Sequence, residues 1–256
     1  MEPKQIVLSA FAALFSDFDP QAAEQHLAPG YVQHNPAVPT GAAPILGLLP
    51  ALRDSGLKVE THRVLADGDY VALHNTYRNA QAFGADEMVA FDIFRVEDGR
   101  VAEHWDNLAA VTPPNPSGRS QTDGPTEISD RDQTAANKAL VSDFVATVLR
   151  DGEVDRITDF VSTETYLQHN SQIADGLEGL GAALAAWAEQ GITMSYRETH
   201  LVIAEGNFVL TASEGDLGGE TMAFYDLFRV ADGKIVEHWD VISPIPAEMA
   251  HDNGKF

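Results

Sequence analysis

Residues 92–106 read Asp-Ile-Phe-Arg-Val-Glu-Asp-Gly-Arg-Val-Ala-Glu-His-Trp-Asp, and residues 226–240 read Asp-Leu-Phe-Arg-Val-Ala-Asp-Gly-Lys-Ile-Val-Glu-His-Trp-Asp. The two stretches agree at ten of fifteen positions, and four of the five differences are conservative. A second pair of motifs, Tyr-Val-Gln-His-Asn at 31–35 and Tyr-Leu-Gln-His-Asn at 166–170, recurs in the same order about 135 positions apart. This period is longer than the ~20–50 residues of solenoid repeats. The sequence therefore indicates a tandem duplication of a whole domain.

The length of 256 residues agrees with two domains that each bury a core of their own. Residues 112–132 contain several Pro and Gly residues among polar ones, so we expect no regular element there. The predicted organisation is a first domain at 1–118, a linker at 119–132 and a second domain at 133–256.

The charge composition excludes several classes of partner. A formal net charge of −23 argues against binding nucleic acid or anionic lipid, because both need a basic face. No apolar run reaches the ~18–20 residues of a membrane span, and the apolar stretch at 6–15 fits a first helix better than a signal peptide. The absence of cysteine is compatible with a reducing compartment. We therefore expect a cytoplasmic protein with no nucleic-acid or membrane partner.

Each half places helices before strands. In the first half the apolar positions of residues 6–15 follow a helical period, Asp19-Pro20 is a helix start, and Pro29-Gly30 is a helix stop. After a third helix the period changes to two, with hairpin turns at 67–68 and 98–99. This order predicts an α+β fold in which a run of antiparallel strands curls around helices. The other expected helices cover residues 42–52, a segment from Lys138, 155–160 and 177–190.

The repeated motif carries a candidate acid/base pair. His104 and Asp106 point the same way because strand side chains alternate, which places a proton carrier beside a carboxylate. A tight two-residue turn at 98–99 puts Asp92 opposite Trp105, whereas a bulge shifts the pairing by one and brings Asp92 alongside His104 and Asp106. The sequence leaves both registers open. It also leaves open a purely structural role, in which Glu103 pairs with Arg95 and Trp105 fills the core.

Four further residues are candidates for the site. His34 and His169 follow a helix stop, where a histidine either leans into the mouth of the fold or caps a turn. His74 has Ala212 as its counterpart, and Tyr77 has no clear match in the second half. If only one site works, this asymmetry favours the first domain.

Metal and cofactor chemistry have little support in the motifs. His34, His74, His104 and Asp106 are ligand types that suit zinc or iron, but no ligand spacing supports such a site. The chain has no phosphate-binding loop, no nucleophile elbow and no dinucleotide fingerprint. We therefore expect no metal and no cofactor.

The motifs at 31–36, 67–74 and 92–106 together resemble the SnoaL-like polyketide cyclase branch of the nuclear transport factor 2-like (ketosteroid isomerase-like) superfamily. The resemblance covers about residues 3–112 and 134–246. It implies two cones, each made of a bent antiparallel sheet and three helices around a ligand cavity. Members of this family often pair as homodimers, so two copies in one chain imply an internal pseudo-dimer. Association of two whole chains stays open.

The resemblance implies an activity without a cofactor. The cyclases of this branch carry out an intramolecular aldol condensation with a late aspartate as acid/base, which matches Asp106 and Asp240, with Asp92 and Asp226 as the fallback. We predict an acid/base enzyme acting on a small carbonyl or polyketide-like compound. The alternatives are a non-catalytic protein that binds a small apolar ligand, and a pair in which one half is only a structural partner. The expected catalytic residues are Asp106, His104, His34, Asp92, Asp240, His238, His169 and Asp226. The expected substrate contacts are Trp105, Trp239, Tyr31, Tyr166, His74 and Tyr77.

Overall fold

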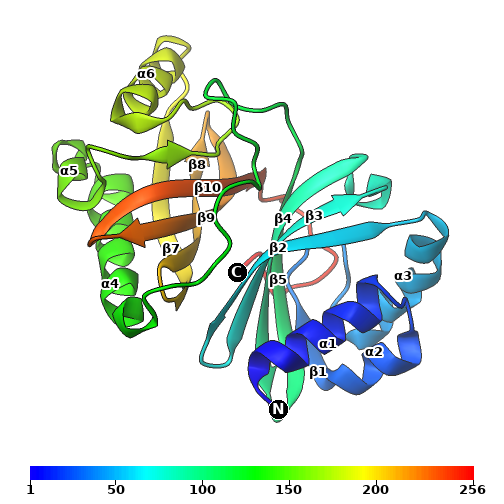
Figure 1. The fold of residues 1–256 in the computed structure, drawn as a ribbon. Helices are drawn as coiled ribbons and strands as arrows, with labels where there is room; N and C mark the ends of the chain where they lie inside the picture. Colours follow the sequence, from blue (N-terminus) through cyan, green and yellow to red (C-terminus); the bar gives the residue numbers. More distant parts are fainter. The chain divides into compact units, whose positions relative to one another are not determined.

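The computed structural model describes residues 1–256 and divides into two compact units (Figure 1). Unit 1 comprises Met1–Val111 together with Ile245–Phe256, and unit 2 comprises Thr112–Pro244. The division differs from the expected domains at both tails. Residues 112–118, which follow the first repeat, pack within unit 2, and residues 245–256, which follow the second repeat, pack within unit 1. None of the helices is both long and apolar enough to span a membrane.

Unit 1 contains three helices, as predicted. The side chain of Asp19 accepts hydrogen bonds from the backbone N–H groups of Gln21 and Ala22 and so caps the second helix, with Pro20 at its first position. The helical elements are α1 (Pro3–Phe15), α2 (Pro20–His26), α3 (Ala42–Asp54) and a short turn η1 (Gln81–Phe83). The strands are β1 (Leu27–Gln33), β2 (Lys58–Asp67), β3 (Tyr70–Arg78), β4 (Glu87–Glu97) and β5 (Arg100–Ala110).

Unit 2 repeats this order with local differences. Its first helix widens into a π-type turn, and its β8–β9 hairpin is shorter than the β3–β4 connection that holds η1. Residues 112–130 contain no helix or strand, as predicted for the linker. The helical elements are η2 (Arg131–Gln133), α4 (Thr134–Phe144), η3 (Val145–Arg150), η4 (Val154–Arg156), α5 (Ile157–Phe160) and α6 (Gly176–Glu189). The strands are β6 (Leu167–Gln168), β7 (Met194–Glu205), β8 (Phe208–Leu217), β9 (Glu220–Ala231) and β10 (Lys234–Pro244).

Each unit has a five-stranded sheet, in the orders β1-β5-β4-β3-β2 and β6-β10-β9-β8-β7. Four strands of each sheet are antiparallel neighbours, whereas β1 and β6 pair parallel with β5 and β10. These parallel edge strands were not predicted. Pro29 and Gly30, interpreted as a helix stop, lie inside β1, and a strand at a sheet edge tolerates both residues because one side of its backbone is free.

A bulge sets the register of the repeated motif. In β4 and β5, Asp92 pairs with Asp106, with a shift between Arg95 and Val96. In β9 and β10, Asp226 pairs with Asp240, with a shift between Ile235 and Glu237 on β10. The second of the two open registers is therefore the one adopted. Because directly paired residues point to the same face, each bulge gathers two aspartates and one histidine.

These residues lie on the face of the sheet that the helices cover. Phe94 pairs with His104, and the ring of Phe94 packs edge-on against Phe11 of α1, with centroids 6.1 Å apart. In unit 2 the ring of Phe144 of α4 packs against Phe228, at 5.7 Å, in the same manner. The repeated motif thus presents its acidic residues and its histidine to the interior of each unit.

Candidate active site

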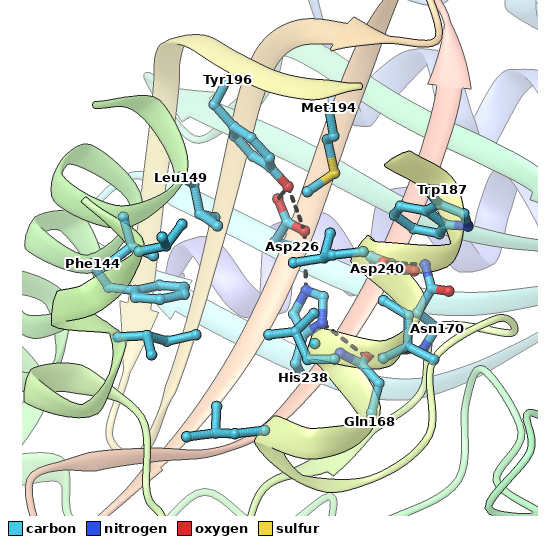
Figure 2. A pocket seen from close by; sticks show the side chains of 18 of the residues that line it. Phe144, Leu149, Gln168, Asn170, Trp187, Met194, Tyr196, Asp226, His238 and Asp240 are labelled. Carbon is cyan, nitrogen blue, oxygen red and sulfur yellow. Dashed lines mark hydrogen bonds and ion pairs between the residues drawn. The ribbon is translucent and has the colours of Figure 1, made fainter. Parts of the chain in front are cut away.

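Unit 2 contains a cavity of about 510 Å³ between the sheet and the helices α4 and α6. Its walls are mainly apolar: Phe144 and Leu149 lie on one side and Trp187 on the other (Figure 2). α6 has no fully buried residue, yet its apolar side chains form part of the wall. The polar residues that line the cavity are Tyr166, Gln168, Asn170, Thr193, Tyr196, Asp226, His238 and Asp240, and no Lys or Arg is among the lining residues.

Asp226, His238 and Asp240 form a compact cluster on the cavity wall (Figure 2). One ligand atom from each lies within 4.8 Å of the other two, and all three residues are buried. Nε2 of His238 lies 3.0 Å from Oδ1 of Asp226. The strand pairing explains the cluster, because Asp240 sits opposite Asp226 and His238 sits two positions before Asp240.

The neighbouring Gln168 determines which atom of His238 carries a proton. Oε1 of Gln168 accepts hydrogen bonds from the backbone N–H groups of His169 and Asn170, at 2.9 and 3.0 Å, so this atom is the carbonyl oxygen. Nδ1 of His238 lies 2.9 Å from the same oxygen and must therefore donate a proton. With Nε2 facing Asp226, the ring is favoured as an imidazolium. The pKa of His238 is raised accordingly: burial opposes the charge, and the hydrogen bond to Asp226 and the two aspartate charges outweigh it.

Asp226 and Asp240 both line the cavity, and Asp240 is the one that is not bonded to His238 or Tyr196. Its Oδ2 accepts a hydrogen bond of 2.7 Å from Nδ2 of Asn170. Burial raises the pKa of Asp240, and the charge of Asp226 raises it further, although His238 and Asn170 act in the opposite direction. A carboxyl group in this condition holds a proton at a higher pH than an exposed aspartate does.

Two tyrosines complete the polar part of the wall. The hydroxyl of Tyr196 donates to Asp226, with Oδ1 and Oδ2 at 3.2 and 3.1 Å. The hydroxyl of Tyr166 accepts from Nε2 of Gln168 at 3.3 Å. Burial, followed by the nearby aspartate charges, raises the pKa of both phenols, so they stay protonated.

Unit 1 holds the same cluster with different neighbours. Nδ1 of His104 lies 3.0 Å from Oε1 of Gln33, and Nε2 lies 3.3 Å from Oδ1 of Asp92. Oδ2 of Asp92 accepts from Nδ2 of Asn75 and the hydroxyl of Tyr77, at 2.7 and 2.9 Å. The tyrosine that bonds the aspartate thus comes from β3 in unit 1 and from β7 in unit 2. Tyr31, the counterpart of Tyr166, is also buried, and burial raises its pKa.

Aromatic side chains and a buried lysine pack around the unit 1 cluster. Phe83 of η1 and Phe15 of α1 pack edge-on against the ring of Tyr77, at 5.6 and 5.9 Å. Leu49 of α3 is fully buried. Lys255, from the tail at 245–256, is 6 % exposed. Its Nζ donates to the backbone carbonyl of Asp106 at 2.6 Å and lies 3.7 Å from Oδ1 of that residue.

Five expected site residues lie away from these clusters, on the opposite face of the sheet. His34 stacks on Trp105 at 4.9 Å and contacts Oε1 of Glu103 at 2.9 Å. Glu103 also pairs with Arg95, as the structural interpretation supposed. His34 was expected beside His104 and Asp106, and this placement corrects that expectation, because the alternation of β5 turns Glu103 and Trp105 away from the helices. His169 and Trp239 stack in the same way, at 4.6 Å, and neither lines the cavity.

His74 requires the same correction, whereas Tyr77 does not. The ring of His74 stacks on Phe91 at 4.4 Å and its Nδ1 lies 3.0 Å from Nη1 of Arg63. Phe91 precedes Asp92 in β4, so His74 faces away from the cluster. The hydroxyl of Tyr77 donates a hydrogen bond to Asp92, and its ring packs against Phe83 and Phe15.

Several site residues were not predicted. Gln168, Asn170 and their counterparts Gln33 and Asn35 stand in the repeated Tyr-x-Gln-His-Asn motif, so the repetition itself was a usable signal. Tyr196 and Lys255 occur in only one repeat and gave no such signal.

A metal ion would find three ligand atoms in each cluster, from Asp92, His104 and Asp106 or from Asp226, His238 and Asp240. In unit 2, Nδ1 of His238 donates to Gln168, which leaves Nε2, 3.0 Å from Oδ1 of Asp226, as the ring atom that could bind a cation. The same residues can also hold and transfer protons.

Comparison with known proteins places the chain in a family. The sequence profile of the SnoaL-like domain matches residues 8–104 and again residues 141–238. No curated protein matches. Among solved structures, the chain is similar to TsrD from Streptomyces laurentii, with 25% identity over 41% of this chain and 87% of that one and a TM-score of 0.36.

Two further structures have comparable scores. A putative polyketide cyclase from Streptomyces antibioticus, IdmH, is 20% identical over 42% of this chain and 92% of its own, with a TM-score of 0.35. An epoxide hydrolase from M. tuberculosis that is described as LEH-like is 20% identical over 42% of this chain and 82% of its own, with a TM-score of 0.35. Since the profile matches well over half of the sequence, in two separate stretches, the chain belongs to the SnoaL-like domain family and contains two copies of its domain.

Proposed function

We propose that unit 2 is a cofactor-independent acid/base enzyme that acts on a small or polyketide-like carbonyl compound. The observation that carries the proposal is the carboxyl group of Asp240, which faces an apolar cavity and has a raised pKa beside a histidine whose two ring nitrogens are both engaged. Both ring nitrogens of His238 are hydrogen-bonded, to Gln168 and to Asp226. Asp240 is the group with freedom to exchange a proton with a ligand.

The reaction begins with proton abstraction next to a carbonyl group. Ionised Asp240 takes the proton from the α-carbon, and the C–H electron pair moves into the carbonyl to form an enolate. The positive charge of His238 stabilises the enolate, and Asn170 holds the second oxygen of Asp240 in place. In a substrate whose enolate is conjugated with a C=C bond, delivery of the proton from Asp240 to the far carbon of that bond, in place of the α-carbon, isomerises the substrate. Alternatively, attack of the enolate carbon on a second carbonyl of the same molecule, with protonation of that oxygen by Asp240, closes an aldol ring.

The raised pKa of Asp240 suits this role, because a base is most effective when its pKa approaches the working pH. Unit 1 supplies the contrast. There the equivalent Asp106 lies beside the buried ammonium of Lys255, and we assign unit 1 the role of structural partner. This assignment reverses the preference for the first domain that His74 and Tyr77 suggested.

Deuterium uptake at the α-carbon of cyclic ketones and β-keto esters in heavy water tests the proposal, because it requires only proton abstraction. Asp240→Asn should lower the exchange rate at least ~10²-fold. Asp106→Asn is the matched control and should change the rate less than twofold. Equal losses from both variants would reject the assignment to unit 2.

A non-catalytic binding protein is the second candidate, favoured by the predominantly apolar wall of the cavity. It predicts that ligands bind to the cavity while no ketone in the panel exchanges its α-protons. In that case Asp240→Asn would alter affinity alone.

A further inference from the structure

The two copies of the cluster differ in one charged group. In unit 1 the ammonium of Lys255 is buried and lies 3.7 Å from a carboxylate oxygen of Asp106. That oxygen has no hydrogen-bond partner, so the lysine charge is its nearest compensation. Nδ2 of Asn35 binds the other oxygen at 2.6 Å. One carboxylate oxygen of Asp106 therefore accepts a hydrogen bond from Asn35, and the ammonium group of Lys255 lies beside the other oxygen.

The tail that carries Lys255 is fixed at several points in unit 1. Nδ1 of His34 lies 3.0 Å from the carbonyl oxygen of Gly254. Nδ2 of Asn253 donates to the carbonyl of Gln33 at 2.8 Å. These contacts place the lysine at the cluster. Burial lowers the pKa of Lys255, and the charges of Asp106 and Asp92 oppose that shift.

Unit 2 retains the acid and its asparagine and lacks the cation. Asn170 binds Oδ2 of Asp240 at 2.7 Å, as Asn35 binds Asp106. The tail at 112–124 has a single basic residue, Arg119, and this residue pairs with Asp175 at 2.9 Å. No Lys or Arg lines the cavity. With Asp226 and Asp240 both ionised, the imidazolium of His238 leaves one negative charge uncompensated.

We propose that the cavity of unit 2 binds a ligand that carries a protonated amine on an apolar body, with the ammonium group beside Asp240 as Lys255 lies beside Asp106. The inference rests on the proposed function only in taking this cavity as the ligand site. In unit 1 the position beside Asp106 is occupied by the ammonium group of Lys255. In unit 2 the equivalent position beside Asp240 would be taken by the ammonium group of the ligand.

The remaining walls define the rest of the ligand. Leu177, Leu180 and Trp187 of α6 face Phe144 and Leu149 across the cavity, so the body of the ligand is apolar. A volume of about 510 Å³ lies within the usual range of sites for drug-sized molecules. A carboxylate or phosphate on the buried part would meet two aspartates, and the one cationic side chain there, His238, is already bonded to Asp226. We therefore expect anionic ligands to bind poorly.

Isothermal titration of the full chain at pH 7 with three probes of one shape tests the proposal. The probes are 1-naphthylmethylamine, 1-naphthylmethanol and 1-naphthoate. We expect the amine to bind at least ~10-fold more tightly than the alcohol, a ratio equal to ~1.4 kcal/mol, and the naphthoate to show no binding. Asp240→Asn should reduce the affinity for the amine to that for the alcohol. Asp106→Asn should leave all three values unchanged.

Two measurements keep the test decisive. The alcohol affinity of Asp240→Asn reports whether the cavity is intact in that variant. In the wild type, the ratio of amine to alcohol affinity should rise with pH as Asp240 ionises, because the pKa of Asp240 is raised above 3.8 and the amine stays charged. Equal affinities for amine and alcohol, absence of binding by all three probes, or a ratio that survives in Asp240→Asn would overturn the proposal.

Failure of this inference is distinguishable from failure of the proposed reaction. If the amine binds at Asp240 but no ketone exchanges its α-protons, the proposed ligand class is supported and the proposed enzymatic activity is rejected. If α-proton exchange depends on Asp240 but the amine binds no more tightly than the alcohol, the proposed activity is supported and the proposed ligand class is rejected.

Discussion

The two clusters, Asp92–His104–Asp106 and Asp226–His238–Asp240, have nearly the same hydrogen bonds and very different surroundings. In unit 1 an aromatic interior and a buried lysine enclose the acids, whereas in unit 2 the acids face a cavity. The sheets are alike because the bulged hairpin and the edge strand are repeated. The helices, the β3–β4 connection and the tail differ. The comparison teaches that the sheet positions the clustered acids and histidine, and that the elements packed on the sheet determine what lies beside them.

The largest expected effect concerns the lysine. Lys255→Met leaves Asp106 buried without its cation and should destabilise unit 1 by about 3–5 kcal/mol, the usual cost of removing one partner of a buried ion pair. Hydrogen exchange followed by mass spectrometry would show the loss as faster exchange in β4 and β5. Adding Asp106→Asn should restore part of the protection, and equal protection of wild type and Lys255→Met would show that the pair contributes nothing.

The third helix of each unit offers the next contrast. Leu49 of α3 is fully buried, whereas Leu180 of α6 is half-buried at the cavity wall. Leu49→Ala should therefore cost about 2–5 kcal/mol of unfolding free energy, and Leu180→Ala less than about 1 kcal/mol. Urea titration of both variants measures the difference. Similar costs would mean that α6 packs as firmly as α3.

A third prediction compares the effects of replacing His238 and His104 on the deuterium exchange rate. His238→Gln removes a positive charge from the cavity wall and should lower the deuterium exchange rate by about 10²–10³-fold, a typical loss for one electrostatic group. His104→Gln should leave the rate nearly unchanged. Because the pKa of His238 is raised, the wild-type rate should stay high above pH 6.5 and decline as the pH rises through that pKa. A rate that climbs steadily with pH would contradict a role for the charged imidazole.

The smallest effect is a gain in stability. The pKa of Asp240 is raised above 3.8, so the folded state binds its proton more tightly than the unfolded state does. Stability from this group therefore falls as the pH rises from 3.8 through the folded pKa. Asp240→Asn removes the penalty and should stabilise unit 2 by about 0.5–2 kcal/mol at pH 7.5, with no gain below pH 3.8. Urea unfolding at several pH values checks both the sign and the window.

Much of the fold could be predicted, because local signals and tertiary packing agree. Asp19-Pro20 marks a helix start on chemical grounds, and the cap is present. The turn at 98–99 and the change of period before it are equally local, since Asp98 and Gly99 both adopt positive φ. The duplication carried these predictions into the second half.

The parts that could not be predicted depend on non-local contacts. The register of Asp92 depends on a one-residue bulge at Ala102 of β5, opposite Arg95 and Val96, and the composition of the sequence does not reveal it. His34 looks like a residue at the mouth of a cavity until β1 is known to pair with β5, which fixes its direction. The side chains that lie beside each cluster come from segments distant in sequence, such as the tail at 245–256, which contributes Lys255.

The placement of the two tails has a consequence for how the protein is made. Unit 1 includes residues 245–256, so its sheet and helices can form early on the ribosome, but its interior charge stays uncompensated until Lys255 emerges. Unit 1 is therefore completed only after residues 112–244 of unit 2 have been synthesised. A ribosome stalled within the second repeat would hold a first unit in which Asp106 lacks the neighbouring ammonium of Lys255.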